Sequence, residues 1–138
     1  MAYKWKILSE EPGDLVGTLL KNRGIEKDQS AAFLSPDWDR DIHDPALFTA
    51  MDAAVARTFD AMEKGEKIVI HGDYDADGIS GTTLVFGILK EIADKLQYTL
   101  DVKPFLPDRE RDGYGVAMHT IERFGKEGVR HVITVDCG

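Results

Sequence analysis

The chain has 138 residues, of which 43% are hydrophobic and 30% are charged, a composition typical of a globular protein with a substantial core. No apolar run approaches the roughly 18 residues that a membrane span requires, and no signal-peptide pattern is present, so we expect a cytoplasmic protein without a membrane partner. The single cysteine, Cys137, excludes an internal disulfide and a cysteine-rich zinc site. The net charge of −8 argues against nucleic-acid binding through the overall field, but clustered metal-binding carboxylates would also lower the net charge.

The N-terminal region has the pattern of short helices. Residues 14–23 place leucines on one face, with Asp14 positioned to cap the start of a helix and Gly24 to end it. A second short helix is predicted around residues 28–34. We expect these helices to form a small arm that precedes the main domain.

An acidic, proline-bounded loop over residues 35–45 marks a candidate linker. We therefore assign residues 1–45 to the helical arm and linker, and residues 46–138 to the main domain. The elements predicted for the main domain are a helix over 47–64, a strand over 67–72, a helix over about 80–95, a strand over 98–106, a helix over 118–128 and a strand over 131–135. Strands with apolar centres that alternate with helices indicate an α/β fold, in which helices cover both faces of a parallel sheet. The apolar residues that we expect together on one face of the helix over 80–95 are Leu84, Val85, Ile88, Leu89 and Ile92.

The stretch "HGDYDADGISG" at residues 71–81 places aspartates at alternate positions and then a glycine. Asp73, Asp75 and Asp77 fit the opening of an EF-hand calcium loop, which needs a glutamate at its twelfth position and a helix on each side. Here the twelfth residue is Leu84, and the preceding "KIVI" is typical of a strand. An aspartate-nucleophile phosphotransferase fits poorly as well, because Asp77 stands where its threonine would be. A divalent-metal site of another kind is the better interpretation.

The carboxyl ends of parallel strands meet at one edge of a sheet, which is where ligands bind in open α/β folds. Asp75 and Asp77 follow one predicted strand, and Asp136 follows another. In an extended chain, residues two apart point the same way and lie roughly 6–7 Å apart. This spacing suits two ions about 3.5–4 Å apart, with Asp136 as the candidate bridging ligand.

Two neighbouring residues are candidate ligands with alternative roles. His71 lies four residues before Asp75, and an imidazole among carboxylates favours a transition metal such as manganese. His71 could equally be a core histidine or one that supports the ligands from behind. Asp73 could bind metal, or it could cap the turn by accepting a backbone amide.

The stretch "FLPDRERDGYGV" carries a second candidate site. Two glycines around Tyr114, Gly113 and Gly115, indicate an unusual backbone, and Arg109 and Arg111 have the forked shape that suits phosphate. The alternative is an ordinary charged loop.

Taken together, "HGDYDADGISGTTL", "FLPDRERDGYGV" and "VITVDCG" resemble the DHH phosphoesterase superfamily and, within it, the RecJ family of bacterial exonucleases. The N-terminal "LLKNRGIEKDQSAAFLSPD" is similar to the arm that precedes the domain in that family. The resemblance implies hydrolysis of phosphodiester bonds in single-stranded DNA, from 5′ to 3′, in DNA recombination and repair. Single-stranded DNA and other DNA-repair proteins are the partners that it implies.

The resemblance also assigns roles to residues. Asp75, Asp77 and Asp136 match aspartates that bind two Mn²⁺ ions and so activate water, with Mg²⁺ as an alternative ion. His71 matches a metal-binding histidine of related pyrophosphatases. The segment with Arg109, Gly113 and Tyr114 matches a stretch near the site where substrate phosphate is expected.

The family's Asp-His-His motif and a further ligand are expected downstream of Gly138, so we expect an N-terminal portion of an enzyme that is inactive by itself. Two alternatives stay open. The parent could be another DHH phosphoesterase that acts on short oligonucleotides or a small phosphorylated molecule. It could also be a non-catalytic relative that binds DNA.

Overall fold

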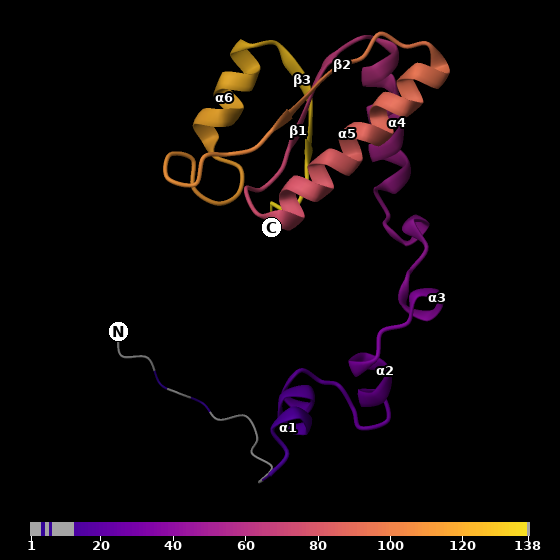
Figure 1. The fold of residues 1–138 in the computed structure, drawn as a ribbon, viewed down its shortest axis with the longest axis vertical. Helices are drawn as coiled ribbons and strands as arrows, with labels where there is room; N and C mark the ends of the chain where they lie inside the picture. The colour runs from indigo at the N-terminus through magenta and orange to yellow at the C-terminus, as the bar shows by residue number, and fades with distance from the viewer. Residues whose placement is uncertain (1–3, 5, 7–12, 138) are drawn as a thin grey trace. The chain divides into compact units, whose positions relative to one another are not determined.

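The computed structural model describes residues 4, 6 and 13–137. The chain divides into two compact units, one that ends at Phe48 and one that begins at Thr49. Figure 1 shows their elements. Among the described residues, no helix combines the length and the apolar character needed to cross a membrane.

The first unit consists of short helices, whose bounds are α1 Leu15–Asn22, α2 Ser30–Leu34, α3 Trp38–Asp41 and the 3-10 helix η1 Pro45–Leu47. The predicted start of α1 is confirmed, because the Asp14 carboxylate accepts the amide of Gly17 at 2.8 Å. Gly24 follows the helix with φ +76°, a left-handed conformation that glycine adopts without strain. The expectation of an irregular loop over 35–45 is wrong in part, because the Asp37 carboxylate caps α3 inside it.

The second unit is the predicted α/β domain. Its elements are α4 Met51–Glu63, β1 Lys67–His71, α5 Ala76–Leu96, β2 Asp101–Phe105, α6 Met118–Lys126 and β3 Val129–Thr134. The strands form a parallel sheet in the order β2-β1-β3, so β1 lies at the centre. At the carboxyl end of β1, His71 lies opposite Phe105 on β2 and Thr134 on β3.

Helices cover both faces of this sheet, with α4 and α5 on one side and α6 on the other, as Figure 1 shows. On the first face, the core packs side chains of α4 and α5 against β1; its buried members are Ala61, Met62, Ile68, Ile70, Leu89 and Ala93. On the second face, the ring of Phe105 lies 5.0 Å from His71 and 5.2 Å from Phe124 of α6. Full burial of a side chain such as Ile70 contributes roughly 1.5–3 kcal/mol, so β1 is held firmly from both sides.

The buried face of α5 differs from the predicted one. Leu89 is buried, and Val85 and Ile92 pack against the core, but Leu84 and Ile88 are 64% and 48% exposed. The N-terminal half of α5 instead packs small residues toward the sheet, since Gly78 and Thr82 are buried there.

Candidate metal-binding site

The carboxyl edge of the sheet continues beyond β1 and β3. The Gly72 amide donates to the Phe105 carbonyl at 3.0 Å, and the Val135 amide donates to the His71 carbonyl at 2.9 Å. The connections from β1 and from β2 run on opposite faces through α5 and α6. The edge between β1 and β3 is therefore the switch point at which open α/β sheets bind their ligands.

Asp75 is the N-terminal cap of α5. Its Oδ1 accepts the amide of Asp77 at 3.1 Å and that of Gly78 at 3.0 Å, which satisfies two of the free amides that begin a helix. The helix consequently starts at Ala76, four residues before the predicted position near 80. The expectation of an extended chain from Asp75 to Asp77 is wrong, because Asp77 lies in the first helical turn.

Asp73 and His71, in contrast to the exposed Asp75 and Asp77, are buried and carry unsatisfied polar atoms. Their residues are 3% and 1% exposed, and neither Asp73 Oδ1 nor His71 Nε2 has a hydrogen-bond partner in the described part of the chain. Burial lowers the pKa of His71, although Asp112 and Asp73 act in the opposite direction, which favours the neutral imidazole that binds metals. Buried polar atoms without partners are costly, so these two fit the role of ion ligands.

Asp136 approaches the same group from β3. Desolvation raises the pKa of Asp136, and the negative charges of Asp75, Asp77 and Asp73 raise it further. These carboxylates therefore repel one another at one edge of the sheet. Asp136 also has φ +57°, in the left-handed region that costs a residue other than glycine about 1 kcal/mol or more. Strained residues of this kind gather at functional sites.

The predicted residues therefore converge, but they do not form a closed cage. Within the residues that the structure describes, no three histidine, cysteine, aspartate or glutamate side chains are grouped so that they could hold an ion together. The Sγ of Cys137 lies 3.4 Å from Nδ1 of His71, which leaves Nε2 as the free nitrogen of that ring.

The loop between β2 and α6 lies beside this edge. Arg109 is placed over the ring of Tyr74, 5.4 Å from its centroid, whereas Arg111 pairs with Asp112 at 3.1 Å. Within the described residues Arg109 makes no ion pair with a carboxylate, so its charge stays available to a ligand. The structure thereby distinguishes Arg109, the arginine that the resemblance puts near substrate phosphate, from Arg111.

The glycines of this loop have the unusual backbone that the sequence indicates. Gly113 and Gly115 have φ +74° and +80°, and a Cβ on Gly115 would lie 3.7 Å from the Cys137 carbonyl oxygen. Between them, desolvation raises the pKa of Tyr114, and the negative charges of Asp136 and Asp73 raise it further. The phenol of Tyr114 thus lies in the field of the carboxylate edge.

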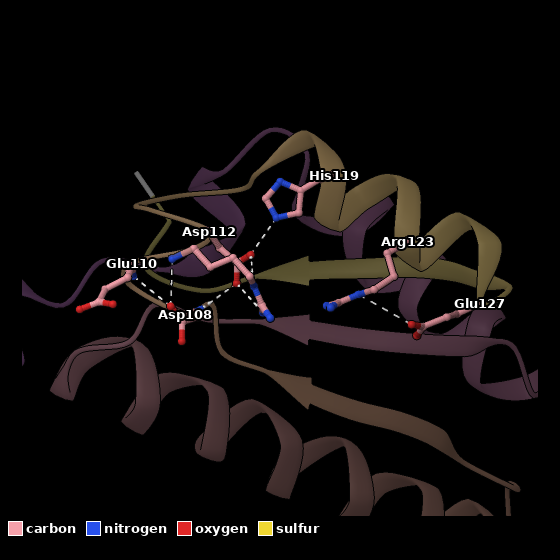
Figure 2. A network of polar contacts seen from close by, with 7 residues as sticks. Asp108, Glu110, Asp112, His119, Arg123 and Glu127 are labelled. Atoms are coloured by element: carbon pink, nitrogen blue, oxygen red, sulfur yellow. Dashed lines mark hydrogen bonds and ion pairs between the residues drawn. The ribbon is translucent and has the colours of Figure 1, made fainter.

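Asp112 and His119, two residues of this region, are not among the site residues that the sequence predicts. Figure 2 shows Asp112 between the turn that begins at Asp108 and His119 of α6. The sequence shows Asp112 only as one more charge in "DRERD", and a contact with His119, seven residues later, is not visible in that pattern.

Comparison with known proteins places this chain in a family. Residues 67–138 match the DHH family, N-terminal domain. The single-stranded-DNA-specific exonuclease RecJ of Bacillus subtilis is 33% identical over 124 residues, which are 90% of this chain and 15% of that protein. The enzyme of the same name from Thermus thermophilus is 39% identical over 85 residues, or 62% of this chain and 12% of that protein.

A solved structure is similar as well. A crystal structure of exonuclease RecJ bound to manganese has a TM-score of 0.53 at 38% sequence identity, over 62% of this chain and 20% of that chain. This chain spans only about 15% of the length of the Bacillus subtilis relative. Because the matched segment covers more than half of the sequence and contains both strands that carry the aspartates, the chain belongs to the DHH family.

Proposed function

We propose that this chain is the N-terminal portion of a metal-dependent, single-strand-specific 5′-to-3′ DNA exonuclease of the RecJ type. The observation that supports the proposal is that Asp75, Asp77 and Asp136 follow the carboxyl ends of two adjacent strands, β1 and β3, and that unsatisfied atoms of His71 and Asp73 belong to the same segment of chain as Asp75. The similarity to exonucleases over 90% of the chain supports the reaction class. Partnership with other DNA-repair proteins belongs to the same proposal and rests on the resemblance alone.

The residues fit a divalent metal. Asp75 would use Oδ2, since Oδ1 already accepts two amides, and Asp77 and Asp136 would add their carboxylates. His71 would use Nε2, a ligand that favours manganese over magnesium. When bound, a pair of such ions supplies an activated water and neutralises phosphate charge. The manganese in the similar crystal structure supports this choice of ion.

The chain's own residues would then bind and orient the substrate. Arg109, which has no carboxylate partner among the described residues, would take a phosphate of the DNA strand. Tyr114 would donate its hydroxyl to the same strand, and the Gly113 backbone would let the strand approach closely. Asp73, buried under the carboxylates, would hold a ligand or the loop itself in place.

The test uses the full-length protein that carries this chain, with Mn²⁺ and 5′-labelled single-stranded DNA. We expect stepwise degradation of the single strand and little action on a blunt duplex. Asp77→Ala and Asp136→Ala should each lower the rate by roughly 100-fold or more, because losing even an outer partner of a metal site costs about 10–100-fold. Asp94→Ala, at an exposed position of α5, is the control.

Other outcomes would point elsewhere. Near-normal degradation by the Asp136→Ala protein would remove Asp136 from the site. Hydrolysis restricted to di- and trinucleotides would favour a DHH phosphoesterase of short oligonucleotides, and DNA binding without hydrolysis would favour a non-catalytic relative. The 138-residue chain alone should not degrade DNA, since the resemblance implies further ligands outside it.

A further inference from the structure

Asp112 is an anchor at the centre of the loop between β2 and α6. Its side chain is 2% exposed, and its two carboxylate oxygens are held by several donors. Oδ2 accepts the Asp108 amide at 2.8 Å and Nη2 of Arg111 at 3.1 Å, while Oδ1 contacts Nε of Arg111 at 3.1 Å and Nε2 of His119 at 2.7 Å. A carboxylate with this many partners fixes the segment that carries it.

The turn around Asp112 is closed by its own backbone. The Asp112 amide donates to the Asp108 carbonyl at 2.8 Å, and Asp108 Oδ1 accepts the amides of Glu110 and Arg111 at 3.0 and 2.9 Å. These contacts fix the conformation of residues 108–112. They do not fix the position of this turn relative to the rest of the domain, because every partner lies within the loop.

His119 provides the attachment. It lies in the first turn of α6 and is the residue outside the loop, among those described, whose side chain hydrogen-bonds to Asp112. Figure 2 shows its ring above the Asp112 carboxylate. Since α6 packs on the sheet through Phe124, the contact ties the loop to the rigid part of the fold.

The tethered loop also touches the carboxylate edge on both sides of Asp112. Arg109 stacks over Tyr74, the residue between Asp73 and Asp75. Gly115 lies within contact range of the backbone that follows Asp136, since a Cβ on this glycine would be 3.7 Å from the Cys137 carbonyl oxygen. A shift of Asp112 would therefore move both ends of the segment that carries Arg109 and Tyr114.

We propose that Asp112 and His119 are positioning residues that hold residues 108–115 beside the carboxylate edge, so that Arg109 and Tyr114 are placed to meet a phosphate of the DNA strand. The DNA phosphate in this proposal rests on the proposed function. The structural half of the proposal, that the contact between Asp112 and His119 holds the loop in place, concerns this chain alone. The contact between Asp112 and His119 acts through Arg109 and Tyr114, and His119 makes no hydrogen bond to a proposed metal ligand among the described residues, so the contact should govern how tightly DNA is held.

The structural half is tested on the 138-residue chain by amide NMR. His119→Ala and Asp112→Asn should both move the signals of Gly113 and Gly115 and leave those of Ile68 and Ile70 in place. His119→Gln, which keeps a side-chain N–H donor, should restore part of the unsubstituted spectrum, and Asp94→Asn should change neither set. Unchanged signals of Gly113 and Gly115 in His119→Ala would show that the contact between Asp112 and His119 does not hold the loop, whatever the protein's activity.

The functional half is tested on the full-length protein with single-stranded DNA. His119→Ala should raise KM by about 10- to 150-fold, the usual range for losing a hydrogen bond to a charged group, and should change kcat by less than about twofold. His119→Gln should recover most of the loss in KM. A lower kcat at constant KM, or no change in either, would overturn the positioning role. If the unsubstituted protein degrades no DNA, the proposed function fails. The NMR result still decides whether the contact between Asp112 and His119 holds the loop.

Discussion

Gly78 is the residue of the aspartate loop whose replacement gives the most direct test of the site's packing. It occupies the first turn of α5 and is buried. A Cβ at this position would lie 2.5 Å from both the amide nitrogen and the carbonyl oxygen of Asp73, a distance that real Cβ atoms essentially never show. The clashing atoms are backbone, so no side-chain rotation can relieve the contact and Asp73 itself must move.

Two effects of opposite sign decide the stability of Gly78→Ala. Alanine favours a helix over glycine by about 0.8–1 kcal/mol. Forcing an extra carbon into a packed site typically costs about 1–3 kcal/mol. Gly87 lies in the middle of the same helix with nothing within 4 Å of its would-be Cβ, so Gly87→Ala has the gain without the clash. The unfolding free energy of Gly87→Ala should exceed that of Gly78→Ala by about 1–3 kcal/mol.

The assay is urea unfolding of the 138-residue chain, followed by helical circular dichroism and extrapolated to zero denaturant. Gly87→Ala should be stabilised and Gly78→Ala destabilised relative to the unsubstituted chain. In the full-length protein, Gly78→Ala should also bind Mn²⁺ more weakly, since Asp73 and Asp75 move together, whereas Gly87→Ala should bind it normally. Equal stabilisation of the two variants would refute the argument that the loop closes against Gly78.

Three further predictions follow from the same geometry. Asp75→Asn should keep the helix cap and lose Mn²⁺ binding, whereas Asp75→Ala should also lose about 1 kcal/mol of stability. Calorimetry measures the Mn²⁺ binding, and urea unfolding measures the stability. Normal Mn²⁺ binding by Asp75→Asn would contradict the ligand assignment. His71→Ala should weaken binding of Mn²⁺ more than that of Mg²⁺ in metal titrations, and equal losses would mean that His71 is only structural. Arg111, the Asp108 amide and His119 hold the pKa of Asp112 well below its usual range, so the stability from its ionised form is complete above the ordinary carboxyl pKa of about 3.9 and is lost as pH falls below it. The difference in unfolding free energy between the unsubstituted chain and Asp112→Asn should therefore shrink from pH 7 to pH 3, and a constant difference would contradict this linkage.

The layout of the main domain could be predicted because its strands and helices have distinct periodicities. Apolar runs such as "KIVI" can be buried on both faces only in the middle of a sheet, and β1 lies there. The start of α5 could not be predicted by the same means. The sequence indicates a metal ligand at Asp75, and a carboxylate placed to bind metal has the same appearance in sequence as one placed to cap a helix.

The buried face of α5 shows a second limit. Hydrophobicity alone favoured Leu84 and Ile88 for the core, yet both are exposed. Near the sheet edge the helix runs so close to the strands that small residues must face inward: a Cβ on Gly81 would lie 2.6 Å from Cγ1 of Val135. This close approach depends on how α5 packs beside the end of β3, and no local pattern of apolar residues encodes it.

The position of Asp75 explains why an aspartate, rather than another capping residue, begins α5. Serine would cap a helix about as well, but its hydroxyl is neutral. The N-terminus of a helix carries about half a positive charge, which opposes a cation nearby, and a carboxylate between them offsets that repulsion. One oxygen of Asp75 suffices for the two amides, so the helix can form before any ion is present. An ion held by the other oxygen would then stabilise the helix start, and its binding free energy would add to that of folding.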